Sequence, residues 1–210
     1  MTAPRALIRL AWVAWLLATS AASAAAQPAV GFVGIGQFGY ERLAAGKSFE
    51  TVLDSAGGGV LGGGAEVRVG GAFVNAAIER FERTGQRVLV IDGEVFKLGI
   101  ANTVTLKPIA VTAGWRFVHE KATPYVGIGV GRITYREQST FTEASENVDA
   151  RFASYHILGG VEFRNEWVAT AFEVQYTRAP DALGVGGASA AFQESDLGGI
   201  VGRVKILVGR

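Results

Sequence analysis

The sequence predicts an all-β fold, an eight-stranded antiparallel transmembrane β-barrel of the up-and-down type. Three observations lead to this prediction: apolar residues alternate with others along successive segments, the connections between these segments alternate in length, and aromatic residues stand at two levels. Hydrophobic residues make up 49% of the chain. Beyond the N-terminal segment, however, no apolar run approaches the ~20 residues of a membrane-spanning helix. The hydrophobicity must therefore lie on alternate positions of strands.

Residues 1–26 have the features of a cleaved secretory signal peptide. Arg5 and Arg9 precede a nine-residue apolar core, Leu10–Ala18, and Ala24–Ala26 offers a small-residue cleavage site. An uncleaved signal anchor is the alternative.

The mature chain, 27–210, is predicted to be one barrel domain. It keeps 18 of the 20 basic residues against 19 acidic ones, and the chain has no cysteine. Neither a disulfide-stapled scaffold nor a polyanion-binding surface is indicated.

Alternation with a period of two defines the strands in order. The predicted strands are 30–43, 61–69, 72–83, 103–118, 124–137, 151–164, 167–178 and a final strand after residue 195. Along 103–118 the apolar residues shift from one set of alternate positions to the other near Pro108. Proline lacks a backbone N–H donor, so a bulge is expected there.

The connections between these strands run long, short, long, short, long, short, long. This rhythm is typical of outer-membrane barrels, which have short periplasmic turns and longer outer loops. Aromatic residues support the same outer-membrane arrangement, because some lie beside the short turns and others lie near the long loops. From Tyr155 to Phe163 the strand spans about 26 Å, which fits two interfacial girdles. The predicted girdle residues are Tyr40, Trp115, Phe117, Tyr135, Tyr155, Phe163, Trp167 and Tyr176. The alternative is a soluble sandwich or barrel with aromatic residues in its core.

The polar faces of the strands are predicted to line the barrel interior. These faces carry Gln37, Glu41, Glu66, Arg68, Glu79, Arg116, His156, Glu162, Glu173, Arg203 and Lys205. An eight-stranded barrel is just wide enough for side chains to fill it, and buried charges need partners. Arg203 and Lys205 are expected to meet Gln37 and Glu41 across the closing seam. Glu162 and Glu173 face inward on adjacent strands and are expected to need such cations nearby. The expected result is a salt-bridged plug, and a narrow polar pathway for small solutes is the alternative.

Catalytic and metal-binding patterns are weak in this sequence. Ser154, His156 and Glu162 share one strand face, and such a set can carry out acyl chemistry. His156 is nevertheless expected to face the polar interior. No enzyme activity, cofactor, metal site or nucleic-acid partner is predicted.

Two neighbouring segments carry a family resemblance. Gly114–Phe117 (GWRF) and Thr123–Glu137 (TPYVGIGVGRITYRE) together resemble one periplasmic hairpin of the small outer-membrane barrels of the OmpA, OmpX, OmpW and opacity type. The resemblance implies a Gram-negative cell envelope, contact with membrane lipid and lipopolysaccharide, and insertion by the barrel-assembly machinery, with the barrel as a monomer. Its members include tethers, adhesins, small-solute channels and a few lipid-modifying enzymes. The chain departs from the family in its last residues, Val208-Gly209-Arg210, where these barrels often end in an aromatic residue.

The segment Gly34–Gly39 reads G-x-G-x-x-G, the fingerprint of dinucleotide-binding folds, and Asp54 follows at about the expected interval. That fold needs a helix of a dozen or so residues after the third glycine. Here only seven residues follow Gly39 before the segment ends at Gly46, which is too short for that helix. The fingerprint is therefore interpreted as part of the first barrel strand, in which Gly34 and Gly36 allow curvature or close packing.

The predicted function is an outer-membrane barrel with a structural or surface-interaction role through four outer loops. A porin-like channel and, more remotely, a lipid-modifying enzyme are the alternatives.

Overall fold

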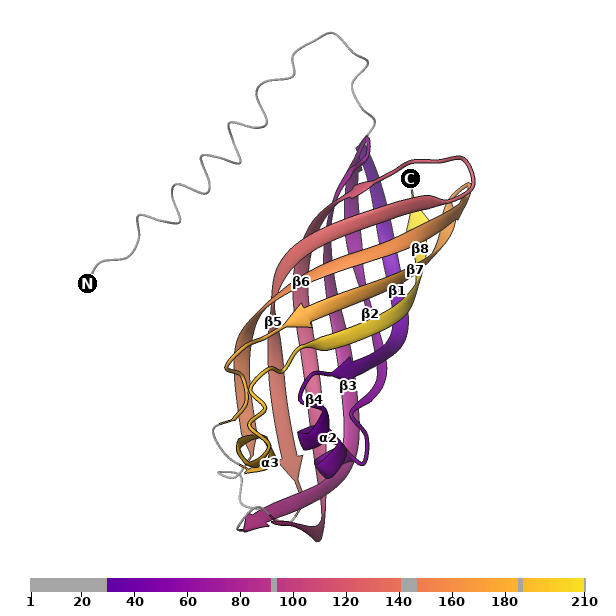
Figure 1. The fold of residues 1–210 in the computed structure, drawn as a ribbon. Coiled ribbons are helices and arrows are strands. Elements are labelled where there is room, and N and C mark those ends of the chain that lie inside the picture. Colours follow the sequence, from indigo (N-terminus) through magenta and orange to yellow (C-terminus); the bar gives the residue numbers. More distant parts are fainter. Residues whose placement is uncertain (1–29, 92–93, 141–146, 185–186, 210) are drawn as a thin grey trace, which may run out of the picture.

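The chain forms a closed eight-stranded antiparallel β-barrel in which each strand pairs with its neighbours in the sequence and β1 pairs with β8 (Figure 1). This computed structural model describes residues 30–91, 94–140, 147–184 and 187–209. The strands are β1 (Val30–Leu43), β2 (Gly57–Val69), β3 (Ala72–Ile91), β4 (Glu94–Arg116), β5 (Thr123–Ser139), β6 (Val148–Asn165), β7 (Val168–Arg178) and β8 (Gly199–Gly209). The predicted fold class is confirmed. The proposed signal peptide lies outside the described residues.

The two ends of the barrel differ, as the alternating connections predict. Short connections after β2, β4 and β6 lie at the end where β1 begins and β8 finishes. The other end carries the longer connections after β1, β5 and β7, with helix α2 (Gly46–Leu53) and the short helix α3 (Gly187–Ala191), and also the end of the β3–β4 hairpin (Figure 1). We call these the turn end and the loop end. Neither of these helices has the length and hydropathy needed to cross a bilayer.

The segment 84–102, predicted as a loop, is mostly strand. β3 continues to Ile91 and β4 starts at Glu94, so this hairpin extends past the other strands at the loop end (Figure 1). Its apolar and β-branched residues, such as Val88, Val90 and Val95, favour strand pairing. The glycines at 57–59 likewise belong to β2 rather than to a loop.

The predicted bulge at Pro108 is wrong. The β3–β4 register is the same on both sides of the proline, with Ile78 opposite Ile109 and Phe81 opposite Leu106. The proline interrupts local pairing with β3 because it lacks an N–H, but it inserts no extra residue. The register shift in this hairpin lies instead between Gln86 and Val88.

The glycine fingerprint lies within the single strand β1, as interpreted from the sequence. Gly39 is the glycine that close packing requires, since a Cβ atom there would lie 2.2 Å from the Gly202 carbonyl oxygen on β8. A Cβ atom on Gly36 would meet nothing within 4 Å. The expected close-packing role therefore falls on the third glycine, at the seam that closes the barrel.

Candidate functional site: the barrel interior, outer wall and mouth

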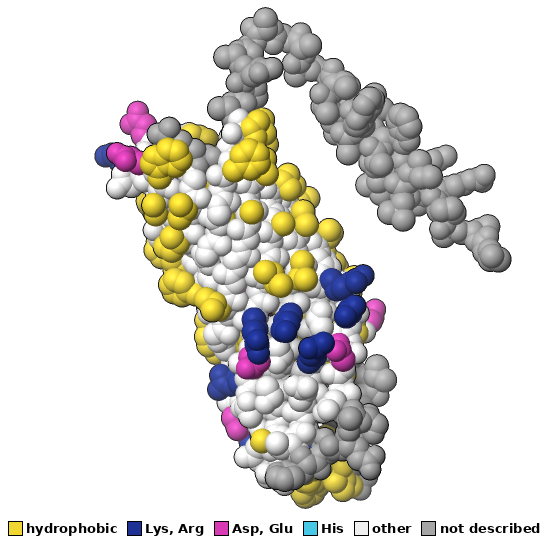
Figure 2. All heavy atoms as spheres, turned by 180° about the vertical axis from the view of Figure 1, so that it is seen from behind, with side chains coloured by type: hydrophobic (Ala, Val, Ile, Leu, Met, Phe, Trp, Pro, Cys, Tyr) yellow, Lys and Arg dark blue, Asp and Glu magenta, His cyan; other side chains and the backbone are white. Residues whose placement is uncertain are grey.

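Strand alternation places many apolar residues on the outside and buries charged residues inside together with two apolar clusters, whereas a soluble protein keeps its charges at the surface. Exposed apolar side chains, including Phe38, Ile128, Ile157 and Val174, cover the wall. Figure 2 shows this apolar band on one face of the barrel, above a belt of Lys and Arg. Such a wall is stable in lipid and costly in water.

Seven of the eight predicted girdle residues stand on this outer wall. Trp115, Phe117, Phe163 and Trp167 lie at the turn end, and Tyr40, Tyr155 and Tyr176 lie toward the loop end; all seven are exposed. The prediction for Tyr135 is wrong. Its side chain points into the barrel, is only 8% exposed and donates a hydrogen bond to Glu137 Oε2 at 2.8 Å.

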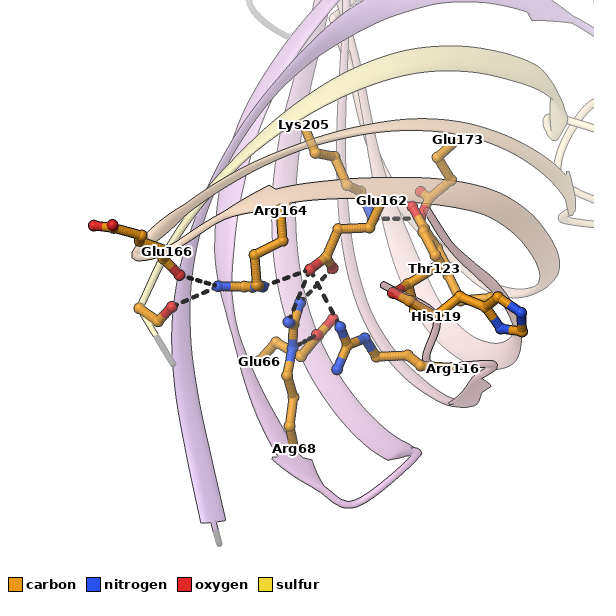
Figure 3. Close-up of polar contacts among 12 residues, drawn as sticks. Glu66, Arg68, Arg116, His119, Thr123, Glu162, Arg164, Glu166, Glu173 and Lys205 are labelled. Atoms are coloured by element: carbon orange, nitrogen blue, oxygen red, sulfur yellow. Dashed lines mark hydrogen bonds and ion pairs between the residues drawn. The ribbon is translucent and has the colours of Figure 1, made fainter. Parts of the chain in front are cut away.

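At the turn end, one buried carboxylate collects three guanidinium groups (Figure 3). Glu162, 2% exposed, accepts hydrogen bonds from Arg68 at 2.8 and 3.2 Å, from Arg116 at 3.2 Å and from Arg164 at 2.9 Å. Glu66 balances the cluster through a further ion pair with Arg68 at 2.5 Å. Arg164 also donates to the Gly209 carbonyl oxygen at 2.8 Å, which fixes the end of β8. The sequence did not single out Arg164, although it shares the inward phase of Glu162.

A second network occupies the middle of the barrel. Arg203 contacts Glu79 at 3.2 Å and Glu173 at 3.3 Å, Lys205 also pairs with Glu173, and Tyr125 donates to Glu173 at 3.0 Å. Across the closing seam Gln37 lies directly opposite Lys205, as expected, but the ion pairs of Arg203 and Lys205 are with Glu79 and Glu173 and not with Glu41. Arg203 lies directly opposite Glu173 on its other neighbour, β7.

Gln37 and Glu41 both lie at the seam between β1 and β8, as expected, and their contacts differ. Gln37 donates a hydrogen bond to Glu79 at 2.7 Å. Glu41 lies opposite Val201 on β8, next to the apolar part of the interior. The charge-paired partners of both cations thus come from β3 and β7 rather than from β1.

His156 lies inside the barrel, as predicted, and its Nε2 atom is 2.8 Å from the hydroxyl of Thr112. The ring thus contacts a threonine on β4 instead of Ser154 on its own strand. This arrangement gives no support to an acyl-transfer site. Among the residues that the structure describes, no group of three or more His, Asp or Glu side chains could hold a metal ion.

The loop-end part of the interior is apolar, which the sequence analysis did not anticipate. A cluster that includes Leu53, Phe81, Val104, Leu106 and Leu197 fills it and continues into helix α2. The charged filling is therefore restricted to the rest of the barrel. Open volume is small in that charged part, with voids of about 30 Å³ beside Arg203 and about 10 Å³ beside Glu162.

Helix α2 is fixed over the mouth by a residue from the last long connection. Glu194 accepts hydrogen bonds from the backbone amides of Lys47 and Ser48 at 3.1 and 2.8 Å, and from the Ser48 hydroxyl at 2.5 Å. The helix has no side-chain cap of its own. Glu194 therefore acts as its cap from 146 residues away.

Basic side chains project from the outer wall just beyond the apolar band on the loop side. We define the basic belt as Arg42, Arg80, Lys107, Arg132, Arg136, Arg151 and Arg178, which are exposed or half-exposed strand residues. Arg80, Arg136 and Arg178 pair with Glu82, Asp149 and Asp196. Among the described residues the other four belt members form no ion pair, so the belt keeps a net positive charge.

No protein-family model matches this sequence, and no curated protein matches it. Among solved structures, the N-terminal β-barrel domain of Pseudomonas aeruginosa OprF is similar, with a TM-score of 0.49 and 10% identity over 85% of this chain and 97% of that chain. Ail, the attachment invasion locus protein of Yersinia pestis, is similar in two structures. In complex with the heparin analogue sucrose octasulfate it gives a TM-score of 0.47 and 12% identity over 86% of this chain and 96% of that chain. Ail alone gives 0.45 and 10% over 88% and 97%. These similarities concern the fold alone.

Proposed function

We propose that this chain is an integral outer-membrane barrel with a structural or surface-interaction role, and that it is not an enzyme. The observation that carries the proposal is the inverted wall, with apolar residues outside, charges inside and exposed aromatic residues at two levels. A lipid bilayer accommodates such a wall between its two interfaces. The proposal includes export by a signal peptide at 1–26, insertion by the barrel-assembly machinery and a monomeric barrel.

The basic belt supports an orientation with the loop end outward, facing lipopolysaccharide. Lys and Arg side chains lie next to the apolar band in Figure 2, where the phosphates of an anionic lipid would lie. Lys107 lies opposite Thr134, which in turn lies opposite Arg151, so cations and hydroxyls share one level of the wall. Guanidinium and ammonium groups bind phosphate through charge-assisted hydrogen bonds.

The packed interior favours a plugged barrel over a channel. Voids of about 30 and 10 Å³ hold two water molecules at most, and an apolar cluster and α2 lie between the charged networks and the mouth. We expect the purified barrel to remain silent in a planar bilayer. Steady single-channel steps would favour the narrow-channel alternative instead.

Cysteine labelling tests the location and the orientation together, because the native chain has no cysteine. Asp181→Cys lies in the connection before β8 and Lys121→Cys in the turn after β4. A membrane-impermeant maleimide added to intact cells is expected to label Asp181→Cys only, and to label both variants after the outer membrane is permeabilised. Heat-dependent gel migration of the outer-membrane fraction provides the fold control. Recovery of the protein in the soluble periplasm would refute the proposal.

A further inference from the structure

A cavity of about 390 Å³ lies at the mouth of the barrel, between helix α2 and the inner wall. Its walls come from α2, from β3 to β6 and from the connection before β8. The volume falls within the range of small-molecule sites, which is about 300–1,000 Å³. It is more than ten times larger than either void in the charged interior.

One side of this cavity carries a carboxylate held in place by neutral groups. Glu137 accepts hydrogen bonds from Asn102 Nδ2 at 2.5 Å and from the Tyr135 hydroxyl at 2.8 Å. Asn102, which is fully buried, is itself fixed by the Ser139 hydroxyl at 2.8 Å. Each oxygen of Glu137 keeps a free acceptor position, since a carboxylate can accept about four hydrogen bonds. No described Lys or Arg lies within ion-pair distance of Glu137; Arg87, which also lines the cavity, has a contact of its own.

The other lining residues are mostly apolar. Phe49 and Val52 face the cavity from α2, Val104 from β4 and Leu183 from the connection before β8. These side chains belong to the apolar cluster of the loop end or pack against it. A ligand with an apolar body would bury surface here, at roughly 25 cal/mol per Å² removed from water.

We propose that the mouth cavity binds small amphiphilic amines. The ammonium group donates to the open positions of Glu137, which Asn102 and Tyr135 hold in a fixed orientation, and the apolar body lies against Phe49, Val52 and Val104. Small amphiphilic amines would then be the ligands in the proposed surface-interaction role. The mouth opens at the loop end, so exposure of the site to the exterior rests on the proposed orientation, while binding itself rests on the fold.

Hexylamine, hexan-1-ol and hexanoate form a matched set of probes with one chain length and three charges. Each is titrated calorimetrically into the purified barrel in nanodiscs, with empty nanodiscs subtracted. Hexylamine is expected to bind saturably and more tightly than the other two. Glu137→Gln is expected to weaken its binding roughly 10- to 100-fold, as the loss of a charge-assisted hydrogen bond predicts. Val52→Trp, which fills the cavity, is expected to abolish binding.

Glu82→Gln is the matched control, because Glu82 is an exposed carboxylate on the outer wall that is paired with Arg80. It is expected to leave hexylamine binding unchanged. Heat-dependent gel migration confirms that each variant is folded, and Val88→Trp replaces Val52→Trp if the latter does not fold. Equal affinity for hexan-1-ol, tighter binding of hexanoate, or unchanged binding by Glu137→Gln would overturn the proposal. None of these outcomes bears on membrane location, which the cysteine labelling tests separately.

Discussion

Glu162 on β6 and Arg68 on β2 form a two-point buried ion pair between residues that are 94 positions apart in the sequence. The distances are 2.8 and 3.2 Å, and both side chains are at most 7% exposed. Arg116 and Arg164 contact the same carboxylate. Glu162 and Glu66 together therefore offset two of the three positive charges in this cluster.

Glu162→Gln is expected to destabilise the folded barrel by about 3–5 kcal/mol, because Arg116 and Arg164 lose their counter-charge inside the barrel while Arg68 keeps only Glu66. Equilibrium urea unfolding in detergent, followed by tryptophan fluorescence, measures the change. The matched control is Glu82→Gln on the exposed outer wall, where loss of an ion pair costs less than about 1 kcal/mol. Equal losses in the two variants would mean that the cluster around Glu162 is not a structural centre.

Glu194→Ala is expected to release helix α2 from the mouth while the barrel remains folded. Three hydrogen bonds to Lys47 and Ser48 are lost, and an eight-residue helix is marginal without a cap. Loss of a cap typically costs about 1 kcal/mol. Hydrogen–deuterium exchange should quicken in residues 46–53 and stay unchanged in β6 and β7.

The control for this variant is Glu50→Ala. Glu50 is an exposed carboxylate on the same helix. If exchange in α2 rises as much in Glu50→Ala as in Glu194→Ala, the cap from the last connection does not hold the helix.

Strand periodicity accounts for the parts of the barrel that the sequence predicted correctly. Successive side chains point to opposite faces, so Tyr155 had to face outward if His156 and Glu162 faced inward. Tyr135 was assigned to the wrong face of β5 because the glycines of this strand do not show which alternate positions face outward. Gly129 is inward, since a Cβ atom there would lie 2.5 Å from the His156 ring, and Tyr135 shares its parity.

Contacts between distant segments were beyond the reach of periodicity. The partner of Arg203 depends on which strand lies beside β8 and at what register, and β7 supplies Glu173 directly opposite. Helix α2 depends on a carboxylate 146 residues away. Neither dependence leaves a local pattern in the sequence.

Val174→Arg tests the membrane-facing wall. Val174 is 58% exposed and lies opposite Gly159, midway between Tyr155 and Phe163 on β6. An arginine near the bilayer midplane of a barrel costs about 2–4 kcal/mol. Reversible folding into lipid vesicles measures this change. The matched variant Thr134→Arg, within the basic belt between Lys107 and Arg151, is expected to change stability by less than about 1 kcal/mol. A small effect at Val174 would mean that this wall does not face lipid.

Asp196 should make the connection before β8 sensitive to acid. Burial would raise the pKa of Asp196, but hydrogen bonds from the Ala179 and Gly198 amides and the Arg178 guanidinium outweigh burial, so its pKa lies below the usual value.

A lowered folded-state pKa contributes stability that is present above the unfolded pKa of about 3.9 and is lost as the pH falls through the folded value. NMR signals of the Ala179 and Gly198 amides are therefore expected to stay constant above about pH 5 and to shift below about pH 4. In Asp196→Asn the same signals should be independent of pH in this range, because no carboxylate titrates beside them. A shift that persists in Asp196→Asn would assign the acid sensitivity to another group.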